Sequence, residues 1–318
     1  MKVNTVLGPV DSSKLGKTLM HEHILCANWT ARMSYPGWIN HDEVVELAVR
    51  MLRAVKACGF QTIVDCTPPG LGRDIAILRE VSEKAEMNII ASTGFYWYEE
   101  VWLVCKDIKR MADRLIQEAE RGIQGTDSKA GIIKCATDKY GLSENNKRLL
   151  EMTARVYEAT GLPVYTHTSI QNRVAPAQQE YLMELGIPAE RMVIGHLGDT
   201  DDLEFIESVL KKGSYAGLDR FGLGWIFPDD KRIHTLAELV KRGYRNQLVL
   251  SHDCSVFIDE FDNEWEERKN VDLNTLQFQY THLPKRIVPK LLEAGLTEED
   301  IDVLFRKVPR DYFEQRPA

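Results

Sequence analysis

The sequence predicts an α/β protein, a (β/α)8 TIM barrel with its active site at the C-terminal ends of the strands. Short apolar runs alternate eight times with longer segments of helical period, which is the pattern of βα units in a parallel sheet. At 318 residues the chain is long enough to close eight such units into a barrel. No Pro- or Ser-rich linker interrupts the alternation, so we expect a single domain over residues 1–318.

The expected strands, in chain order, are 18–23, 62–66, 88–93, 131–135, 163–167, 192–196, 214–219 and 248–253. Between them, apolar residues recur three and four positions apart, which gives each helix one apolar face to lay on the barrel. The acidic segment 254–274 breaks this rhythm. It can be a loop that closes over substrate beside the active face, or a solvated excursion.

The composition is that of an ordinary globular protein, with 44% apolar and 28% charged residues. No apolar run approaches the roughly 20 residues that a membrane span needs, and the N-terminus lacks an export signal, so we expect a cytoplasmic protein without membrane contact. A net charge of −8 argues against nucleic acid as a partner, because phosphate binding requires clustered Lys and Arg.

Two histidines at the end of the first expected strand suggest a metal site. His21 and His23 are two positions apart, so both side chains face the same side of the strand and can bind one ion together. This spacing alone is a weak signal. Its position at the C-terminal end of a barrel strand, where barrel enzymes place their catalytic groups, strengthens it.

Three further polar residues end later strands in the same way. His167 and His196 close the fifth and sixth expected strands, and Asp253 closes the eighth. Each alone could be a polar residue at the barrel rim. The chain has only eight histidines, and four of them at the same end of core strands predict a metal centre.

Lys134 ends the apolar run 131–134, where an ammonium group would repel metal ions and resist burial. Carbamylation by carbon dioxide would turn its side chain into a carboxylate whose two oxygens can bridge two ions. The alternative is a lysine that reaches solvent or pairs with Asp138. We expect two divalent ions, with zinc as the first choice and cobalt, manganese or iron also suited to nitrogen and oxygen ligands.

Such a centre predicts hydrolysis without a protein nucleophile. Two ions would share a bridging hydroxide that attacks the substrate, while one ion polarises the oxygen under attack. Asp253 would bind one ion and carry the proton to the leaving group. The substrate is expected to be a small molecule with an electrophilic carbonyl or phosphoryl group.

Five motifs in this order are specific for one family. They are MHEH at 20–23, GIIKCATD at 131–138, THT at 166–168, GHLGDT at 195–200 and SHD at 251–253. The chain therefore resembles, nearly end to end, the phosphotriesterase family of the amidohydrolase superfamily, and especially its phosphotriesterase-like lactonases. The resemblance implies a homodimer. It also implies a binuclear centre with the more buried ion on His21, His23 and Asp253, the more exposed ion on His167 and His196, and carbamylated Lys134 as the bridge.

The resemblance also assigns two catalytic residues outside the ligand set. Arg220, in GLDRFG at 217–222, would lie at the substrate cleft, and the Tyr96 hydroxyl would orient the lactone or its departing alkoxide. Taken alone, the arginine could simply pair with a carboxylate and the tyrosine could simply pack.

We therefore expect a lactonase that opens N-acyl-homoserine or related γ- and δ-lactones, as in quorum quenching, with weak organophosphate triesterase activity. The short segment after Arg220 favours lactones over a phosphotriesterase proper, which has a longer insertion there. An acyl tail would need an apolar channel, and the candidates to line it are Trp225, Ile226, Phe227, Phe257 and Trp265.

Two other readings stay open. A sugar or phosphorylated sugar lactone would need cationic groups at the cleft, for which Arg32, Arg73 and Lys106 are available. A non-catalytic barrel would be supported by the loss of a ligand, but all six expected positions are filled.

Overall fold

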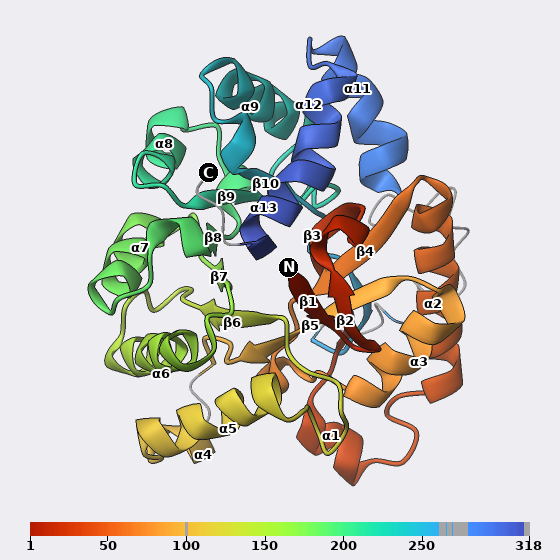
Figure 1. Ribbon diagram of the computed structural model, residues 1–318, viewed down its shortest axis with the longest axis vertical. Helices are drawn as coiled ribbons and strands as arrows, with labels where there is room; N and C mark the ends of the chain where they lie inside the picture. The colour runs from red at the N-terminus through yellow and green to blue at the C-terminus, as the bar shows by residue number, and fades with distance from the viewer. Residues whose placement is uncertain (99–100, 261–264, 266–268, 270–278, 315–318) are drawn as a thin grey trace.

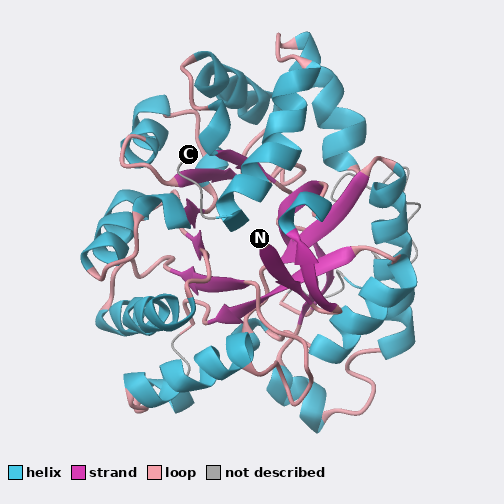
Figure 2. Ribbon diagram, in the orientation of Figure 1, coloured by secondary structure: helices cyan, strands magenta, loops and turns pink. Residues whose placement is uncertain are grey.

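Nine parallel strands form one curled sheet, with helices around its outer side (Figure 1, Figure 2). The computed structural model describes residues 1–98, 101–260, 265, 269 and 279–314. From β3 to β10, strands that follow one another in the chain are neighbours in the sheet, and β11 pairs with β3. The strand order is β10-β9-β8-β7-β6-β5-β4-β3-β11. The strands are β3 Lys17–Cys26, β4 Phe60–Asp65, β5 Asn88–Gly94, β6 Ile132–Ala136, β7 Val164–His167, β8 Met192–Ile194, β9 Tyr215–Leu218, β10 Leu248–Leu250 and β11 Ser255–Ile258.

The sheet closes where the segment after β10 meets β3. The Asp253 N–H donates to the His21 carbonyl at 3.0 Å, and the His21 N–H donates to Ser251 Oγ at 2.9 Å. Because β3 pairs on its other side with β4, these bonds join the two ends of the sheet. The expected α/β barrel is thereby confirmed.

Four expected strands are shorter than predicted, and the barrel sheet has one additional strand. The sixth ends at Ile194 and the eighth at Leu250, so His196 and Asp253 follow their strands instead of ending them. Both residues have a left-handed backbone, with φ of 64° and 56°, which turns the chain sharply out of the sheet.

The expected loop 254–274 begins with a strand. Residues Ser255–Ile258 form β11 and pair in parallel with β3, with Phe257 opposite Leu25. Most of the remaining acidic segment, at 261–264, 266–268 and 270–274, lies outside the described residues.

The helices surround the sheet as the apolar periodicity predicted (Figure 1). They are α1 Trp29–Ser34, α2 His41–Ala57, α3 Ile75–Ala85, α4 Val101–Val104, α5 Ile108–Glu120, α6 Glu144–Thr160, α7 Ala175–Glu184, α8 Leu203–Leu210, α9 Asp229–Lys241, α11 Val288–Glu293, α12 Glu298–Asp302 and α13 Val308–Glu314. None of the helices in the described ranges is both long and apolar enough to cross a bilayer.

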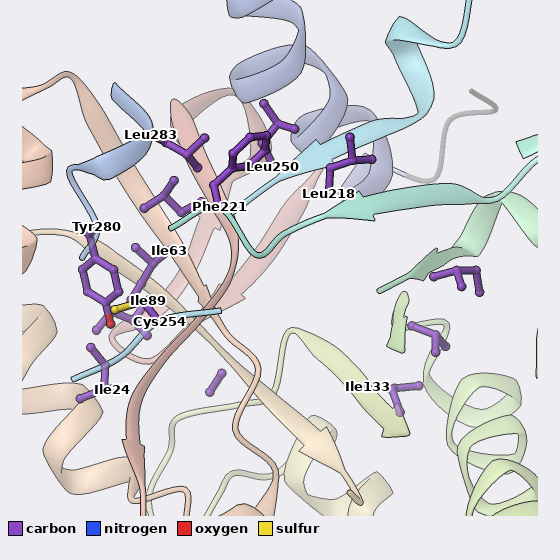
Figure 3. Packing of buried hydrophobic residues seen from close by; sticks show 14 of the residues in the cluster. Ile24, Ile63, Ile89, Ile133, Leu218, Phe221, Leu250, Cys254, Tyr280 and Leu283 are labelled. Carbon is purple, nitrogen blue, oxygen red and sulfur yellow. The ribbon is translucent and has the colours of Figure 1, made fainter. Parts of the chain in front are cut away.

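Alternation along the strands separates two apolar clusters. In β6, Ile133 belongs to the large cluster between strands and helices, part of which Figure 3 shows, whereas Ile132 belongs to a second cluster inside the barrel. Successive side chains of a strand point to opposite faces, so Lys134 shares the interior face with Ile132. The fold itself therefore directs this lysine into the barrel.

The N-terminal hairpin covers the end of the barrel opposite the predicted site. Its strands are β1 Lys2–Thr5 and β2 Gly8–Asp11. Next to it, Asn4 Nδ2 donates to the Ala130 carbonyl at 3.0 Å, and the Val6 N–H donates to the Ile89 carbonyl at 2.9 Å, at the starts of β6 and β5. The hairpin therefore lies away from the C-terminal ends of the strands, where the functional site is predicted.

Candidate metal centre

The six residues predicted as metal ligands converge at the C-terminal ends of the strands. His21 and His23 come from β3, Lys134 from β6 and His167 from β7, while His196 and Asp253 follow β8 and β10. All are buried except Asp253, whose side chain is 14% exposed. The closest approaches are His23 Nε2 to Asp253 Oδ1 at 2.9 Å, His21 Nε2 to Asp253 Oδ1 at 3.2 Å, His21 Nε2 to Lys134 Nζ at 3.1 Å and His196 Nε2 to His167 Nδ1 at 2.9 Å.

The donor atoms fall into two sets. His21, His23 and Asp253 can together hold one metal ion, because their ligand atoms lie within 4.8 Å of one another. His167 and His196 face each other as a second pair. The grouping agrees with the division between two ions that the family resemblance implied.

The outer nitrogen of each imidazole already has a hydrogen-bond partner. His21 Nδ1 and His196 Nδ1 lie 3.1 and 2.9 Å from the two oxygens of Asp219. His167 Nε2 lies 2.8 Å from Asp138 Oδ2. These carboxylates accept N–H bonds, so the opposite nitrogen of each ring presents a lone pair to the site.

His23 is held by Thr67, whose Oγ1 lies 2.8 Å from His23 Nδ1.

Because carboxylates bind the outer nitrogens, the inner nitrogens of His167 and His196 face each other with their lone pairs, 2.9 Å apart. The inner nitrogen of His21 faces the Asp253 carboxylate. Such contacts repel unless a cation lies between them. The donor set fits metal ions for this reason, and outer carboxylate partners of this kind are usual for metal-bound histidines.

Burial keeps three of the four imidazoles neutral, which is the form that binds a metal. His23 is the exception, because Cys26 and Asp253 outweigh its burial and raise its pKa to about 10. Burial lowers the pKa of His21 to about 4, with Lys134 adding to the effect. Burial likewise lowers the pKa of His167, and it lowers that of His196 well below the ordinary value. Burial would raise the pKa of Asp253, but His21 and Arg220 hold it well below its usual range, so this carboxylate is ionised.

Lys134 is buried at the centre of the site with 1% of its surface exposed. Its Nζ lies 3.1 Å from His21 Nε2 and 5.4 Å from the centre of the Tyr165 ring. Within the described ranges no carboxylate forms an ion pair with it. The alternative of a lysine that reaches solvent or pairs with Asp138 is therefore wrong, since Asp138 bonds to His167 instead.

A cleft of about 200 Å³ opens directly above the centre. The predicted residues Tyr96 and Arg220 both line it, together with His23 and Asp253. The Tyr96 hydroxyl lies 3.3 Å from His167 Nδ1. Arg220 donates from Nε to Asp253 Oδ2 at 2.8 Å, and from a terminal nitrogen to Asp199 at 3.0 Å.

A second hollow of about 260 Å³ adjoins the first and shares Cys26, Leu71, Ile258 and Glu260 with it. Its further lining is partly polar, from Asn28, Tyr98 and Asp259. The Tyr98 hydroxyl donates to Glu260, which links the segment after β5 to the segment after β11.

The expected apolar channel is only partly present. Trp225 and Ile226 line the cleft, at 73% and 43% exposure. Phe257 is instead a core residue, and its ring contacts that of Trp265 with ring centres 5.1 Å apart and the planes tilted by 54°. The prediction for Phe257 was wrong because β11, which carries it, was taken for a loop.

Two of the cations considered for a phosphorylated substrate are already engaged. Arg32 pairs with Asp74 and Arg73 with Glu118, each at 2.5 Å.

The sequence analysis missed Asp219 and Thr67 as partners of the histidines. A signal for Asp219 existed, because Tyr215 faces the barrel interior and positions 217 and 219 share that face. Thr67 lies beyond the end of β4, and no local pattern marks it.

A closed parallel barrel with buried histidines and carboxylates at its C-terminal end defines the class of metal-binding barrel hydrolases. The family is specified by comparison with family models, since residues 1–313 match that of the Phosphotriesterase family. The chain belongs to this family, as its motifs predicted, and is a hydrolase.

Relatives of different activity align over nearly the whole chain. A phosphotriesterase homology protein of Mycobacterium tuberculosis is 35% identical over 99% of this chain and 98% of its own length. An aryldialkylphosphatase of Saccharolobus solfataricus is 34% identical over 96% of both chains. An N-acetyltaurine hydrolase of Rattus norvegicus is 30% identical over 98% of this chain and 97% of its own.

A solved structure, that of the phosphotriesterase from Mycobacterium tuberculosis, superimposes with a TM-score of 0.91 at 35% identity and covers 100% of both chains.

Proposed function

We propose that the chain is a lactonase that opens N-acyl-homoserine or related γ- and δ-lactones, with weak hydrolysis of organophosphate triesters. The observation behind this proposal is the facing lone pairs of His167 and His196, which need a cation, beside a small cleft whose lining residue Tyr96 contacts His167. The short connection from Arg220 to α9, which begins at Asp229, leaves that cleft open to a ring-shaped ester.

The proposed centre holds two divalent ions, zinc in the first place. His21, His23 and Asp253 would bind one and His167 and His196 the other, with Lys134 as a carbamate between them. Bound there, the ions would lower the pKa of a water molecule and polarise the carbonyl oxygen of the substrate. The burial of Lys134 without a carboxylate partner among the described residues supports the carbamate.

Asp253 is placed to move the proton. Its Oδ2 accepts a bond from Arg220 and its Oδ1 faces His21 and His23, so the carboxylate is held at the floor of the cleft. Being ionised, it can take the proton of the attacking water and deliver it to the ring oxygen as the C–O bond breaks.

Tyr96 is placed to orient the ester. Burial raises the pKa of its hydroxyl well above the ordinary value, so the group stays protonated and can donate a hydrogen bond to the lactone. Arg220 keeps its charge and fixes Asp253 from the side.

A neutral sugar lactone is the second candidate, because the outer hollow offers the carboxylates of Asp259 and Glu260 and the amide of Asn28 to hydroxyl groups. A phosphorylated sugar is less favoured. Among the described residues that line the two hollows, Arg220 is the only arginine or lysine, and it already contacts Asp253 and Asp199.

The test is acid release by metal-loaded protein, measured at constant pH with acyl-homoserine lactones, simple γ- and δ-lactones, sugar lactones and a phosphate triester. Elemental analysis of the same sample gives the metal identity and number. We expect the acyl-homoserine or simple lactones to have the highest kcat/KM. Absence of acid release with every lactone would rule the proposal out. The homodimer and the cytoplasmic location stay predictions, and light scattering tests the first.

A further inference from the structure

Asp219, which directly follows β9, contacts two histidines of the candidate centre, His21 and His196. Its side chain is fully buried, and each of its two carboxylate oxygens accepts two hydrogen bonds. Oδ2 accepts from the Tyr165 hydroxyl at 2.7 Å and lies 3.1 Å from His21 Nδ1. Oδ1 accepts from the His196 backbone N–H at 3.0 Å and lies 2.9 Å from His196 Nδ1.

The two imidazoles that share this carboxylate belong to different donor sets. His21 stands with His23 and Asp253, whereas His196 faces His167. We propose that Asp219 is a positioning residue that couples the two metal sites, so that disturbing it weakens both together. The inference rests on the two-ion centre of the proposed function.

Asp219 could also be considered as a ligand itself, since its oxygens and nitrogens of His21 and His196 lie within 4.8 Å of one another. The geometry argues against a role of Asp219 as a metal ligand. Its oxygens meet the Nδ1 atoms, while the Nε2 atoms face Lys134, Asp253 and His167 on the far side of the rings. An ion on the Nδ1 side would be separated from these other donors.

The Asp219 carboxylate fits into its site because position 217 is a glycine. Gly217 precedes Asp219 by two residues on the same face of the strand, and a Cβ added there would lie 2.5 Å from Asp219 Oδ2. Any larger side chain at position 217 would displace the carboxylate. Gly217 therefore belongs to the same arrangement.

The other two histidines provide matched controls, because each has an outer partner of its own. Asp138 contacts only His167, and Thr67 contacts only His23 among the four histidines. A defect at Asp138 should therefore affect one site, whereas a defect at Asp219 should affect both.

The test compares Asp219→Asn with Asp138→Asn by metal titration against a chromophoric chelator, with zinc and with cobalt. Asparagine has one acceptor oxygen and one NH2 group, so one of its two ends must lose the bonds it accepts, and the remaining oxygen is a weaker acceptor. We expect D219N to weaken both binding steps by about 10- to 100-fold, and D138N to weaken one step by a similar factor. The visible spectrum of the cobalt protein reports the ligand geometry independently of activity.

Weakening of only one step in D219N, or of neither, would overturn the coupling. If circular dichroism shows that D219N is unfolded, Gly217→Ala decides by the same criterion, because it displaces the carboxylate without removing it. Wild-type protein that binds fewer than two ions would refute the two-ion centre itself. That outcome is read from the wild type alone, so the two failures are distinguishable.

Discussion

The floor of the cleft, formed by the predicted metal ligands, differs in construction from its wall, formed by loop residues such as Trp225 and Glu260. On the floor, every predicted ligand comes from a strand or its immediate exit and is nearly excluded from solvent. The four histidines are each held by a further contact, such as that of Asp219 or Thr67. On the wall, Trp225 is 73% exposed, and Glu260 is an exposed loop residue. The barrel therefore determines the chemistry, and the loops determine which substrate reaches it.

Removing the metal should produce the largest change, because it acts on the whole floor. Dialysis against a strong chelator should reduce hydrolysis to background and lower the free energy of unfolding by about 3 kcal/mol when the metal had been near 100 times its Kd. Calorimetry and the constant-pH assay measure both effects, with zinc re-addition as the control. Full activity in metal-free protein would contradict the proposed chemistry.

The second-largest loss of activity is expected for Asp253→Asn. The amide keeps the shape but cannot accept the proton, so kcat/KM should fall by about 10²- to 10⁴-fold. Metal content measured on the same sample separates loss of the proton acceptor from loss of an ion. If the variant binds its metal normally and keeps more than a tenth of the activity, another group moves the proton.

Lys134→Ala removes the proposed bridge. We expect loss of at least one ion per chain and a fall in activity of about a hundredfold, comparable with the upper effect of outer-partner substitutions. Elemental analysis decides, since two retained ions would count against the bridge. Mass spectrometry of the native protein, with and without bicarbonate, reports the carbamate directly.

Tyr96→Phe tests the junction of floor and wall. It removes one neutral hydrogen bond to the substrate, worth about 1 kcal/mol, so kcat/KM should fall about five- to tenfold with unchanged metal content. Steady-state kinetics with a lactone and with a phosphate triester check this. An unchanged rate would reduce Tyr96 to a packing residue.

Trp225→Ala should have the smallest effect, confined to the wall. Its ring is already mostly exposed, so we expect KM for long-chain lactones to rise by no more than about fivefold, with kcat for the smallest lactone unchanged. A comparison of chain lengths in one assay measures this. A large fall in kcat for every substrate would show that wall and floor are not independent.

Much of the floor could be predicted because strand periodicity and position at a strand end are local properties. The apolar runs located all eight barrel strands, and the histidines followed from their positions. The exits of β8 and β10 could not be read in the same way. The left-handed turns at His196 and Asp253 are stabilised by bonds to Asp219 and to the His21 carbonyl, which are distant in the chain.

Two other predictions failed for the same physical reason. Phe257 looked like a loop aromatic until its pairing with β3 placed it in the core, and Asp138 looked like a partner for Lys134 until His167 was found beside it. These choices depend on which distant segments come together.

The amino-acid sequence alone determined the fold class, the family and the identity of the residues that gather at the floor, because these follow from periodicity and motif order. Only the tertiary structure decided which nitrogen of each histidine faces inward, that Lys134 has no carboxylate partner among the described residues, and that one carboxylate, Asp219, joins both halves of the centre. Hydrogen bonds between residues about 200 positions apart, such as that from His21 to Asp219, form only when the barrel closes.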